Sequence, residues 1–308
     1  MAKRARESTE MRPVACLSGG FFEASLAEDW NSVFPKVVAA GFVAVEWAPF
    51  FVKDLRKLGA ALKAHGLEFI AQIHTGGNPC EFRDVGAHKK HLRELVDRAI
   101  LLKPVFINSH SGHDSWSAEQ TLDYLRAAAS LEAEVGITIC HETHRKRILW
   151  NPFIARDVYR LADAAGVKFS VNCDLSHWAL VCGRFFDAPA DDEWPEILAA
   201  TAARAHYVHT RVGYTEGAQV PHPRAPEYAA ARDAHEAWWD AIWRSQIRRG
   251  FARAYACPEF FGANYGQRVP FTNVPVADHW EIQQYMKDRE LERFAKLLDV
   301  EDGGYGVD

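Results

Sequence analysis

The chain has 308 residues and a formal net charge of −5, with 48% hydrophobic and 25% charged residues. These are the proportions of an ordinary globular protein, and they exclude collagen-like, coiled-coil and largely disordered chains. No apolar run approaches the roughly 18 residues needed to cross a bilayer, so no membrane span is predicted. The acidic balance also argues against a protein whose main task is to bind the phosphate backbone of a nucleic acid.

The segment Met1–Pro13 is polar and basic and has no apolar stretch, so it is interpreted as a flexible tail rather than a secretory signal. The six cysteines are scattered and form no C-x-x-C pair. This pattern indicates a reduced compartment, and we expect a cytoplasmic protein.

Eight short runs of apolar, β-branched or aromatic residues follow, and they are typical of β-strands. Their starts lie on average about 34 residues apart, enough for a strand, a helix and two loops. In chain order the predicted strands are Val14–Leu17, Val43–Trp47, Glu68–Ile73, Val105–His110, Ile137–Glu142, Phe169–Asp174, His206–His209 and Ala254–Glu259.

Amphipathic stretches rich in Ala, Leu and Arg lie between these runs and predict helices. Ser117 with Gln120 has the pattern of a capping box, and Asn151-Pro152 that of an N-cap followed by proline. Glycines follow several of the stretches, where a left-handed residue often ends a helix. The predicted helices are Asn31–Ala40, Asp54–His65, His88–Leu101, Ala118–Val135, Ile154–Ala164, Glu227–Arg248 and Val276–Leu298.

Eight strand–helix units with apolar strands predict a single-domain (β/α)8 TIM barrel. The barrel is expected over residues 14–298, with tails at 1–13 and 299–308. A doubly wound open sheet is the main alternative, but neither a G-x-G-x-x-G nor a P-loop motif follows the first strand.

Four successive predicted strands end in polar residues that packing does not require. The fifth to eighth runs end in Glu142, Asp174, His209 and Glu259. Active sites of TIM barrels lie at the carboxyl ends of the strands, so these side chains are expected to converge. Three converging carboxylates repel one another unless a cation lies between them. We therefore predict one divalent metal ion bound by these four residues, with Mn favoured and Mg, Co or Zn as alternatives. The other interpretation is four separate surface acids and loop residues.

The set Glu142, Asp174-Leu-Ser-His177, His209-Thr-Arg211 and Pro258-Glu259 resembles the xylose isomerase-like TIM-barrel superfamily over about Val14 to Leu298. That superfamily includes sugar-phosphate isomerases and epimerases, ketose 3-epimerases, inosose dehydratases and endonuclease IV. The resemblance implies that Glu142, Asp174, His209 and Glu259 are metal ligands. It also implies that His177 binds substrate or a second metal, and that Arg211 reaches a substrate oxygen.

A metal bound to a carbonyl oxygen and a neighbouring hydroxyl acidifies the C–H between them and stabilises the resulting enediolate. Glu142 and Glu259 are the expected catalytic acid/base pair, because they lie on different strands around the predicted metal. The predicted function is a metal-dependent sugar isomerase or epimerase. The runner-up is a lyase, a dehydratase or a glycoside-cleaving enzyme that uses the same site on a keto-sugar.

Other polar residues near the strand ends have two interpretations each. Glu46, His74 and His110 are assigned to substrate binding, with a structural ion pair or hydrogen bond as the alternative. His144 and Arg145, in the loop after the fifth run, are expected to bind hydroxyl or carboxylate groups of a substrate.

An endonuclease IV-like DNA-repair nuclease is the remote alternative. His74, His110 and His177, together with the four predicted metal ligands, resemble most of that family's trinuclear zinc site. However, the loop after the seventh run reads Gln219-Val-Pro-His222 and lacks the expected aspartate. The net negative charge also gives no basic track for DNA, so no nucleic-acid or membrane partner is expected. No phosphate-binding glycine loop follows the seventh or eighth run, and we therefore expect a small sugar or polyol without phosphate as the substrate, and a possible homo-oligomer.

Aromatic residues near the strand ends also have two interpretations. Trp47, Trp178, Phe260 and Phe261 are candidates for an apolar wall against a sugar, whereas Trp238, Trp239 and Trp243 have helical spacing and are expected in the core or at an interface. Cys140, Cys173 and Cys257 are interpreted as packing residues.

Overall fold

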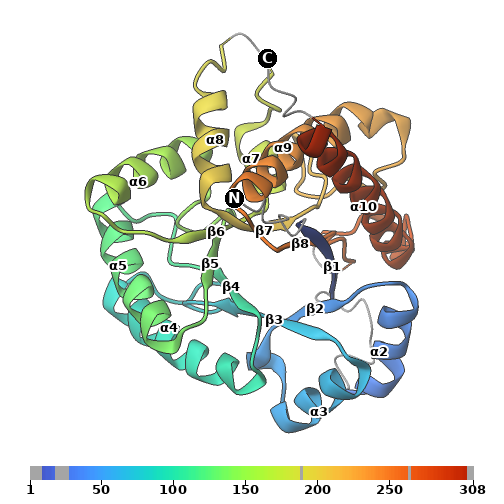
Figure 1. Ribbon diagram of the computed structural model, residues 1–308, viewed down its shortest axis with the longest axis horizontal. Helices are drawn as coiled ribbons and strands as arrows, with labels where there is room; N and C mark the ends of the chain where they lie inside the picture. The colour runs from blue at the N-terminus through green and yellow to red at the C-terminus, as the bar shows by residue number, and fades with distance from the viewer. Residues whose placement is uncertain (1–8, 18–27, 188–189, 263–264, 304–308) are drawn as a thin grey trace, which may run out of the picture.

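The strands close into a parallel barrel in the computed structural model, which describes residues 9–17, 28–187, 190–262 and 265–303. Each strand pairs with its neighbours in chain order, and β1 also pairs with β8 (Figure 1). The predicted (β/α)8 fold is confirmed. The strands are β1 (Glu10–Cys16), β2 (Ala44–Trp47), β3 (Glu68–His74), β4 (Phe106–His110), β5 (Ile139–Glu142), β6 (Ser170–Cys173), β7 (Ala205–His209) and β8 (Arg253–Cys257).

The first strand is longer than its sequence pattern suggests, and it begins at Glu10 instead of Val14. Its second half pairs with β2 from Val14 onward, whereas its first half, residues 10–13, pairs with β8. Strands in a barrel are tilted, so the two neighbours of a strand meet it at different heights. Residues 10–13, assigned to the tail because they are polar, are therefore needed to close the barrel.

Helices surround the barrel on its outside (Figure 1). The last helix continues to Gly303, so the boundary placed at residue 298 was too early. The helices are α2 (Trp30–Ala39), α3 (Leu55–His65), α4 (Val85–Ala99), α5 (Ala118–Val135), α6 (Pro152–Ala164), α7 (Ser176–Cys182), α8 (Trp194–Arg204), α9 (Ala229–Arg248) and α10 (His279–Gly303), with short 3-10 turns at Pro49–Phe51, Ile100–Leu102 and Pro226–Tyr228. A two-stranded hairpin, β9 (Arg268–Val269) and β10 (Val274–Pro275), lies between β8 and α10.

The predicted helix ends are confirmed where they depend on local chemistry. Ser117 and Gln120 form a reciprocal capping box at the start of α5, and the Asn151 side chain accepts hydrogen bonds from the first amides of α6. Gly66 and Gly136 end α3 and α5 with positive φ angles. Helices α7 and α8 were not predicted. Helix α7 has only seven residues and lies directly after the β6 strand end, so no amphipathic period identifies it.

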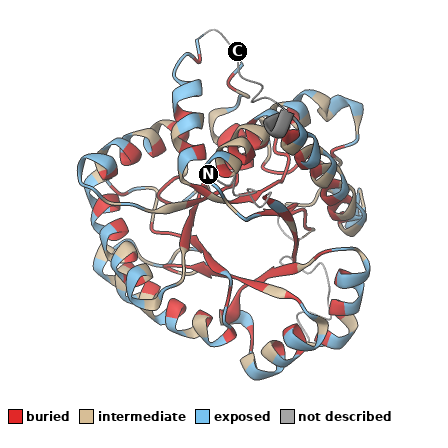
Figure 2. Cartoon of the chain, viewed as in Figure 1, coloured by how far each residue is buried: buried red, intermediate tan, exposed pale blue. Residues whose placement is uncertain are grey.

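The buried apolar residues form two clusters. The larger lies between the strands and the helices, so that the buried residues follow the barrel wall and the inner faces of the helices (Figure 2). The smaller consists of inward-facing strand residues with one loop residue, Phe261, and includes Phe106, Tyr207 and Tyr255, whose rings meet edge to face. Among the described residues, no helix has the length and hydropathy of a membrane span.

Candidate active site and metal centre

Side chains alternate between the two faces of each strand, and this alternation selects the residues at the barrel mouth. Tyr207 packs in the inner cluster, so His209, two residues further on, also faces inward. The same step of two residues leads from Phe106 to Asn108 and His110, and from Cys140 to Glu142. All of these polar side chains are buried. Apolar layers therefore fill the middle of the barrel, and a polar layer covers them at the carboxyl ends.

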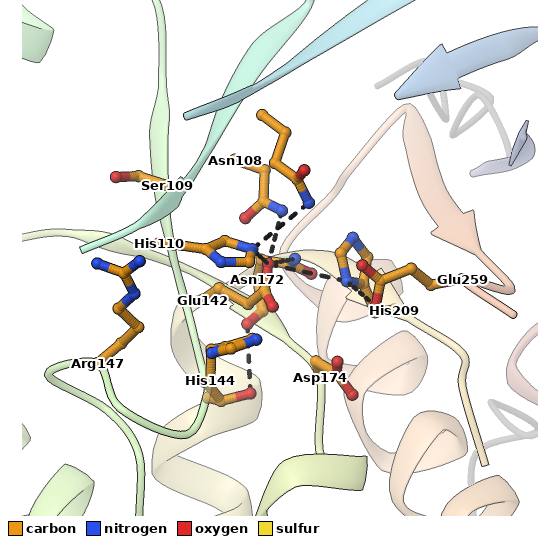
Figure 3. A network of polar contacts seen from close by, with 12 residues as sticks. Asn108, Ser109, His110, Glu142, His144, Arg147, Asn172, Asp174, His209 and Glu259 are labelled. Carbon is orange, nitrogen blue, oxygen red and sulfur yellow. Dashed lines mark hydrogen bonds and ion pairs between the residues drawn. The ribbon is translucent and has the colours of Figure 1, made fainter. Parts of the chain in front are cut away.

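Three of the four predicted metal ligands lie close enough to share one ion. Donor atoms of Asp174, His209 and Glu259 lie within 4.8 Å of one another. The His209 Nδ1 atom lies 3.0 Å from Glu259 Oε2 and 3.8 Å from Glu142 Oε2, so Glu142 adjoins the same group. Figure 3 shows Glu142, His209 and Glu259 converging from three strand ends. Glu142 also belongs to two neighbouring groups, one with Asp174 and His177 and one with His110 and His144.

Several donor atoms of this cluster have no hydrogen-bond partner. Glu142 Oε1, His209 Nδ1 and Glu259 Oε2 are buried and have no hydrogen-bond partner, although Glu259 Oε2 lies within ion-pair distance of His209 and Arg211. Buried polar atoms without partners are rare and costly. Two carboxylate oxygens and an imidazole nitrogen are also a donor set suited to a divalent cation. The residues present therefore fit the divalent ion predicted from the sequence.

The carboxylate of Glu46 lies behind His209, although this residue was predicted to contact substrate. Its Oε2 atom lies 2.9 Å from His209 Nε2 and accepts a hydrogen bond of 2.5 Å from the Tyr207 hydroxyl. Its Oε1 atom accepts from Asn108 Nδ2 at 2.9 Å. Both oxygens are thus engaged inside the barrel, and His209 Nδ1 is left facing Glu259.

Asparagines and a histidine orient the carboxylate of Glu142. Its Oε2 atom accepts hydrogen bonds from Asn108 at 2.7 Å and from Asn172 at 3.2 Å. His110 Nε2 lies 2.9 Å from the same oxygen. Glu142 is thus fixed by neighbouring strands on both sides, β4 and β6, and its Oε1 atom remains available.

Burial and charge shift the pKa values of this cluster in opposite directions. Burial opposes a charge on His209, but the carboxylates of Glu259, Glu46 and Glu142 outweigh it and raise the His209 pKa well above its ordinary value. Burial raises the pKa of Glu142 and also that of Asp174, despite the nearby Arg211. These directions show that the cluster favours a positive charge at its centre.

Arg211 supplies part of that positive charge. Its Nη2 atom donates a charge-assisted hydrogen bond to Asp174 Oδ2, lies 3.2 Å from Glu259 Oε2 and lies 3.0 Å from His177 Nε2. Arg211 was predicted to reach a substrate oxygen. Its Nη1 atom is buried and has no hydrogen-bond partner, so one donor of the guanidinium remains free.

Neutral histidines form a row beside the carboxylates. The ring of His110 stacks on His74 at 4.1 Å and lies 4.4 Å from His144, and His144 lies 4.0 Å from His177. Burial lowers the pKa of all four well below the ordinary value. Both ring nitrogens of His74 are buried without a partner. The predicted substrate-binding histidines are thus brought together as uncharged groups.

Two residues at the barrel mouth were not predicted from the sequence. The guanidinium of Arg147 is buried and donates to the carbonyls of Thr75, Gly77 and Gly112, which joins the loops after β3, β4 and β5. Tyr265, in the loop after β8, lies with its hydroxyl 3.4 Å from His144 Nε2. Neither residue ends a predicted strand, so strand-end reasoning could not find them.

Most of the aromatic residues proposed as a wall against a sugar lie elsewhere. Trp47, Trp178 and Phe260 are buried in the cluster between strands and helices. Phe261 belongs to the inner cluster, beneath the Arg211 guanidinium at 5.6 Å. The expected core residues Trp238, Trp239 and Trp243 are buried in the cluster between strands and helices. Successive residues of a strand face opposite sides of the sheet. Glu46 faces the inside of the barrel, so the next residue, Trp47, faces the helices.

Polar residues in the loop after β7 bind neighbouring segments of the chain. The Gln219 side chain exchanges hydrogen bonds with the backbone of Phe261, at 3.1 and 3.2 Å. His222 lies 3.4 Å from Glu281. Gln219 therefore fastens the β7 loop to the β8 loop.

A separate hollow lies at the opposite end of the barrel. It has a volume of about 770 Å³ and is lined by residues that precede β5 and β6, among them Gly136 and Gly166. The convergence of unpaired polar atoms, rather than volume, therefore identifies the candidate site.

Residues 34–237 match the family model of the xylose isomerase-like TIM barrel, and the chain belongs to this family. Searching the curated proteins gives no significant match. Among solved structures, the chain is similar to an AP endonuclease, family 2, from Brucella melitensis, with 18% identity, a TM-score of 0.52, and coverage of 80% of this chain and 92% of that one.

It is also similar to a D-psicose 3-epimerase from Clostridium cellulolyticum H10, with 15% identity, a TM-score of 0.53, and coverage of 94% and 98%. A probable 3-DHS dehydratase, AsbF, from Bacillus anthracis has 14% identity, a TM-score of 0.53, and coverage of 90% and 98%. Identities this low show a shared fold, and the activity of this chain has to be argued from its own residues.

Proposed function

We propose that this chain is a divalent-metal-dependent isomerase or epimerase of a small sugar. The supporting observation is the cluster at the barrel mouth, where Asp174, His209 and Glu259 present donor atoms within 4.8 Å beside Glu142. Asp174, His209, Glu259 and Glu142 would hold one ion, with manganese favoured by the mixed oxygen and nitrogen donors. The sugar epimerase among the similar structures is consistent with this class of substrate.

Glu142 is the proposed base that removes the proton from the carbon beside the carbonyl. Burial raises its pKa, which makes the carboxylate a better proton acceptor. Asn108 and Asn172 fix its Oε2 atom, so Oε1 can point to the substrate. A bound divalent ion would polarise the carbonyl and stabilise the negative charge that develops on the substrate oxygens.

Glu259 is the proposed second acid/base group. It lies after β8, and the His209 Nδ1 atom is close to both carboxylates, 3.0 Å from Glu259 Oε2 and 3.8 Å from Glu142 Oε2. A proton that the same residue returns to the neighbouring carbon, while the hydroxyl proton of that carbon moves to the former carbonyl oxygen, gives isomerisation. Delivery by the other residue to the opposite face of the original carbon gives epimerisation. Arg211 and the neutral histidines would bind the hydroxyl oxygens and fix the sugar between the two carboxylates.

A lyase is the second candidate, because loss of a β-hydroxyl can follow the same proton abstraction. It is favoured by the neutral imidazoles of His110 and His144, which lie beside Glu142 and can donate a hydrogen bond to a departing hydroxyl. The probable dehydratase among the similar structures is consistent with this reaction.

The decisive experiment is a panel of ketoses, 3-keto-glycosides and inososes incubated with the manganese-loaded protein in deuterated solvent. We expect deuterium at a carbon next to the carbonyl, without loss of water, as followed by NMR. Loss of water would select the lyase. Neither exchange nor water loss with any substrate of the panel would contradict the proposed function.

A further inference from the structure

Three arginines surround the mouth, and the carboxylates there do not pair with all of them. Arg211 contacts Asp174 and Glu259. Arg145 and Arg147 have no carboxylate within ion-pair distance in the part of the chain that the structure describes. Arg145 is half-buried and Arg147 is buried, so water screens their charges only partly.

Two of these guanidiniums contact the ring of Tyr265. The guanidinium carbon of Arg211 lies 4.5 Å from the centre of its ring, and that of Arg145 lies 5.0 Å from the same centre. Two cations around one ring repel each other, although each is attracted to the ring. A negatively charged group that contacts both guanidiniums would offset this repulsion.

One hydrogen-bond donor of these two guanidiniums has no acceptor. Arg211 is 1% exposed, and its Nη1 atom has no hydrogen-bond partner. A buried guanidinium donor without a partner is costly, and an anionic oxygen is its strongest acceptor. The unpaired Nη1 atom of Arg211 therefore points to an anionic ligand at this position.

The charges of the loaded site add up to a small positive sum. The negative charges are the four carboxylates of Glu46, Glu142, Asp174 and Glu259. The positive charges are three guanidiniums and one divalent ion, so the net charge is +1 when the histidines are neutral. A ligand with one negative charge neutralises it. A phosphate dianion would instead leave one negative charge in the site, next to Asp174 and Glu259.

From these observations we infer that the substrate is an acidic sugar whose carboxylate binds between Arg211 and Arg145. The inference rests on the proposed function and narrows its substrate class, since the sequence indicated a small sugar or polyol without specifying an acid. Arg147 does not reach the ligand through its donors, because they bind the backbone carbonyls of Thr75, Gly77 and Gly112. It contributes its charge and the position of the loop that bears Arg145.

The test compares D-gluconate with D-glucitol, which differ only in the carboxylate at C1, and with D-glucitol 6-phosphate. Binding to the manganese-loaded protein is measured by calorimetry. We expect gluconate to bind at least about tenfold more tightly than glucitol and glucitol 6-phosphate. In Arg145→Met the ratio of gluconate affinity to glucitol affinity should fall at least about fivefold. Lys146→Met, the same change of charge at the adjacent exposed residue, should leave the ratio unchanged.

Equal affinities for gluconate and glucitol, absence of gluconate binding, or an unchanged ratio in Arg145→Met would overturn the inference. Tighter binding of glucitol 6-phosphate would also overturn it, in favour of a phosphorylated substrate. Because this is a binding measurement, it is separable from the proposed reaction. Gluconate binding that depends on Arg145, without hydrogen exchange in any substrate, would reject the reaction alone. Exchange with neutral ketoses, without an effect of Arg145, would reject the acidic substrate alone.

Discussion

Glu46 Oε2 lies 2.9 Å from His209 Nε2, and this contact leaves the other ring nitrogen of His209 facing Glu259 at 3.0 Å. A carboxylate that accepts from one nitrogen of an imidazole fixes its tautomer and directs the other nitrogen to a metal. Burial opposes ionisation of Glu46, but the charge of His209 and its hydrogen bond hold the Glu46 pKa below the ordinary value. Glu46 is thus a positioning residue in the proposed centre.

Glu46→Gln should weaken manganese binding by about 10- to 100-fold, because the neutral amide orients and polarises His209 less well. Electron paramagnetic resonance of free manganese in a titration measures this affinity. Glu68→Gln is the matched control, since Glu68 pairs with Arg12 and Arg253 near the other end of the barrel and should leave the affinity unchanged. Equal affinities of Glu46→Gln and the unaltered protein would remove the assigned role.

Glu142→Gln and Glu259→Gln should each reduce turnover by about 10²- to 10⁴-fold or more, because an amide cannot accept the transferred proton. The rate of solvent deuterium incorporation into the substrate measures the step directly. Circular dichroism and thermal unfolding of each variant serve as the control for folding. Unimpaired turnover in both variants would end the proposed mechanism.

Manganese should stabilise the folded chain, since it would pair His209 Nδ1 and Glu259 Oε2 and relieve the repulsion among the carboxylates. At a hundredfold excess over the dissociation constant the gain is about 2.7 kcal/mol, which corresponds to a rise in Tm of several degrees. Differential scanning calorimetry with manganese and with a chelator measures the difference. Asp174→Asn combined with Glu259→Gln should abolish it, and a Tm that does not respond to metal in the unaltered protein would contradict the centre.

His235 should make the fold sensitive to mild acid. Burial lowers its pKa to about 4, and its ring bonds the Ala231 carbonyl through Nδ1 and the Gly213 amide through Nε2, which suits only the neutral form. An unfolded chain binds a proton at this residue below a pH of about 6.5, whereas the folded chain does so only near pH 4. Stability is therefore lost as the pH falls from about 6.5 to about 4, by about 3 kcal/mol for this residue.

In His235→Gln this part of the pH dependence disappears. Urea unfolding at pH 7.5 and pH 5 should show a loss on acidification that is about 2 kcal/mol smaller in the variant than in the unaltered protein. The variant is expected to be less stable at pH 7.5, because a glutamine packs less well in this site. The same loss on acidification in both proteins would show that His235 does not titrate in this range.

The amino-acid sequence by itself determined the barrel, its approximate boundaries and the row of strand-end residues Glu142, Asp174, His209 and Glu259. These features depend on short-range regularities. Strands alternate with a period of two, helices begin and end at capping residues such as Ser117 and Asn151, and parallel strands expose their carboxyl ends at one edge.

Only the tertiary structure decided which polar residues contact and position one another. Glu46 and His209 are 163 positions apart, and nothing local distinguishes a carboxylate that contacts substrate from one that lies behind a histidine. Tyr265 and Arg147 reach the mouth through loops whose course depends on long-range packing. Closure of the barrel likewise brought residues 10–13 into the sheet, although nothing in their sequence indicates a strand. The strands are tilted, so β1 pairs with β8 through its first residues and with β2 through its last ones.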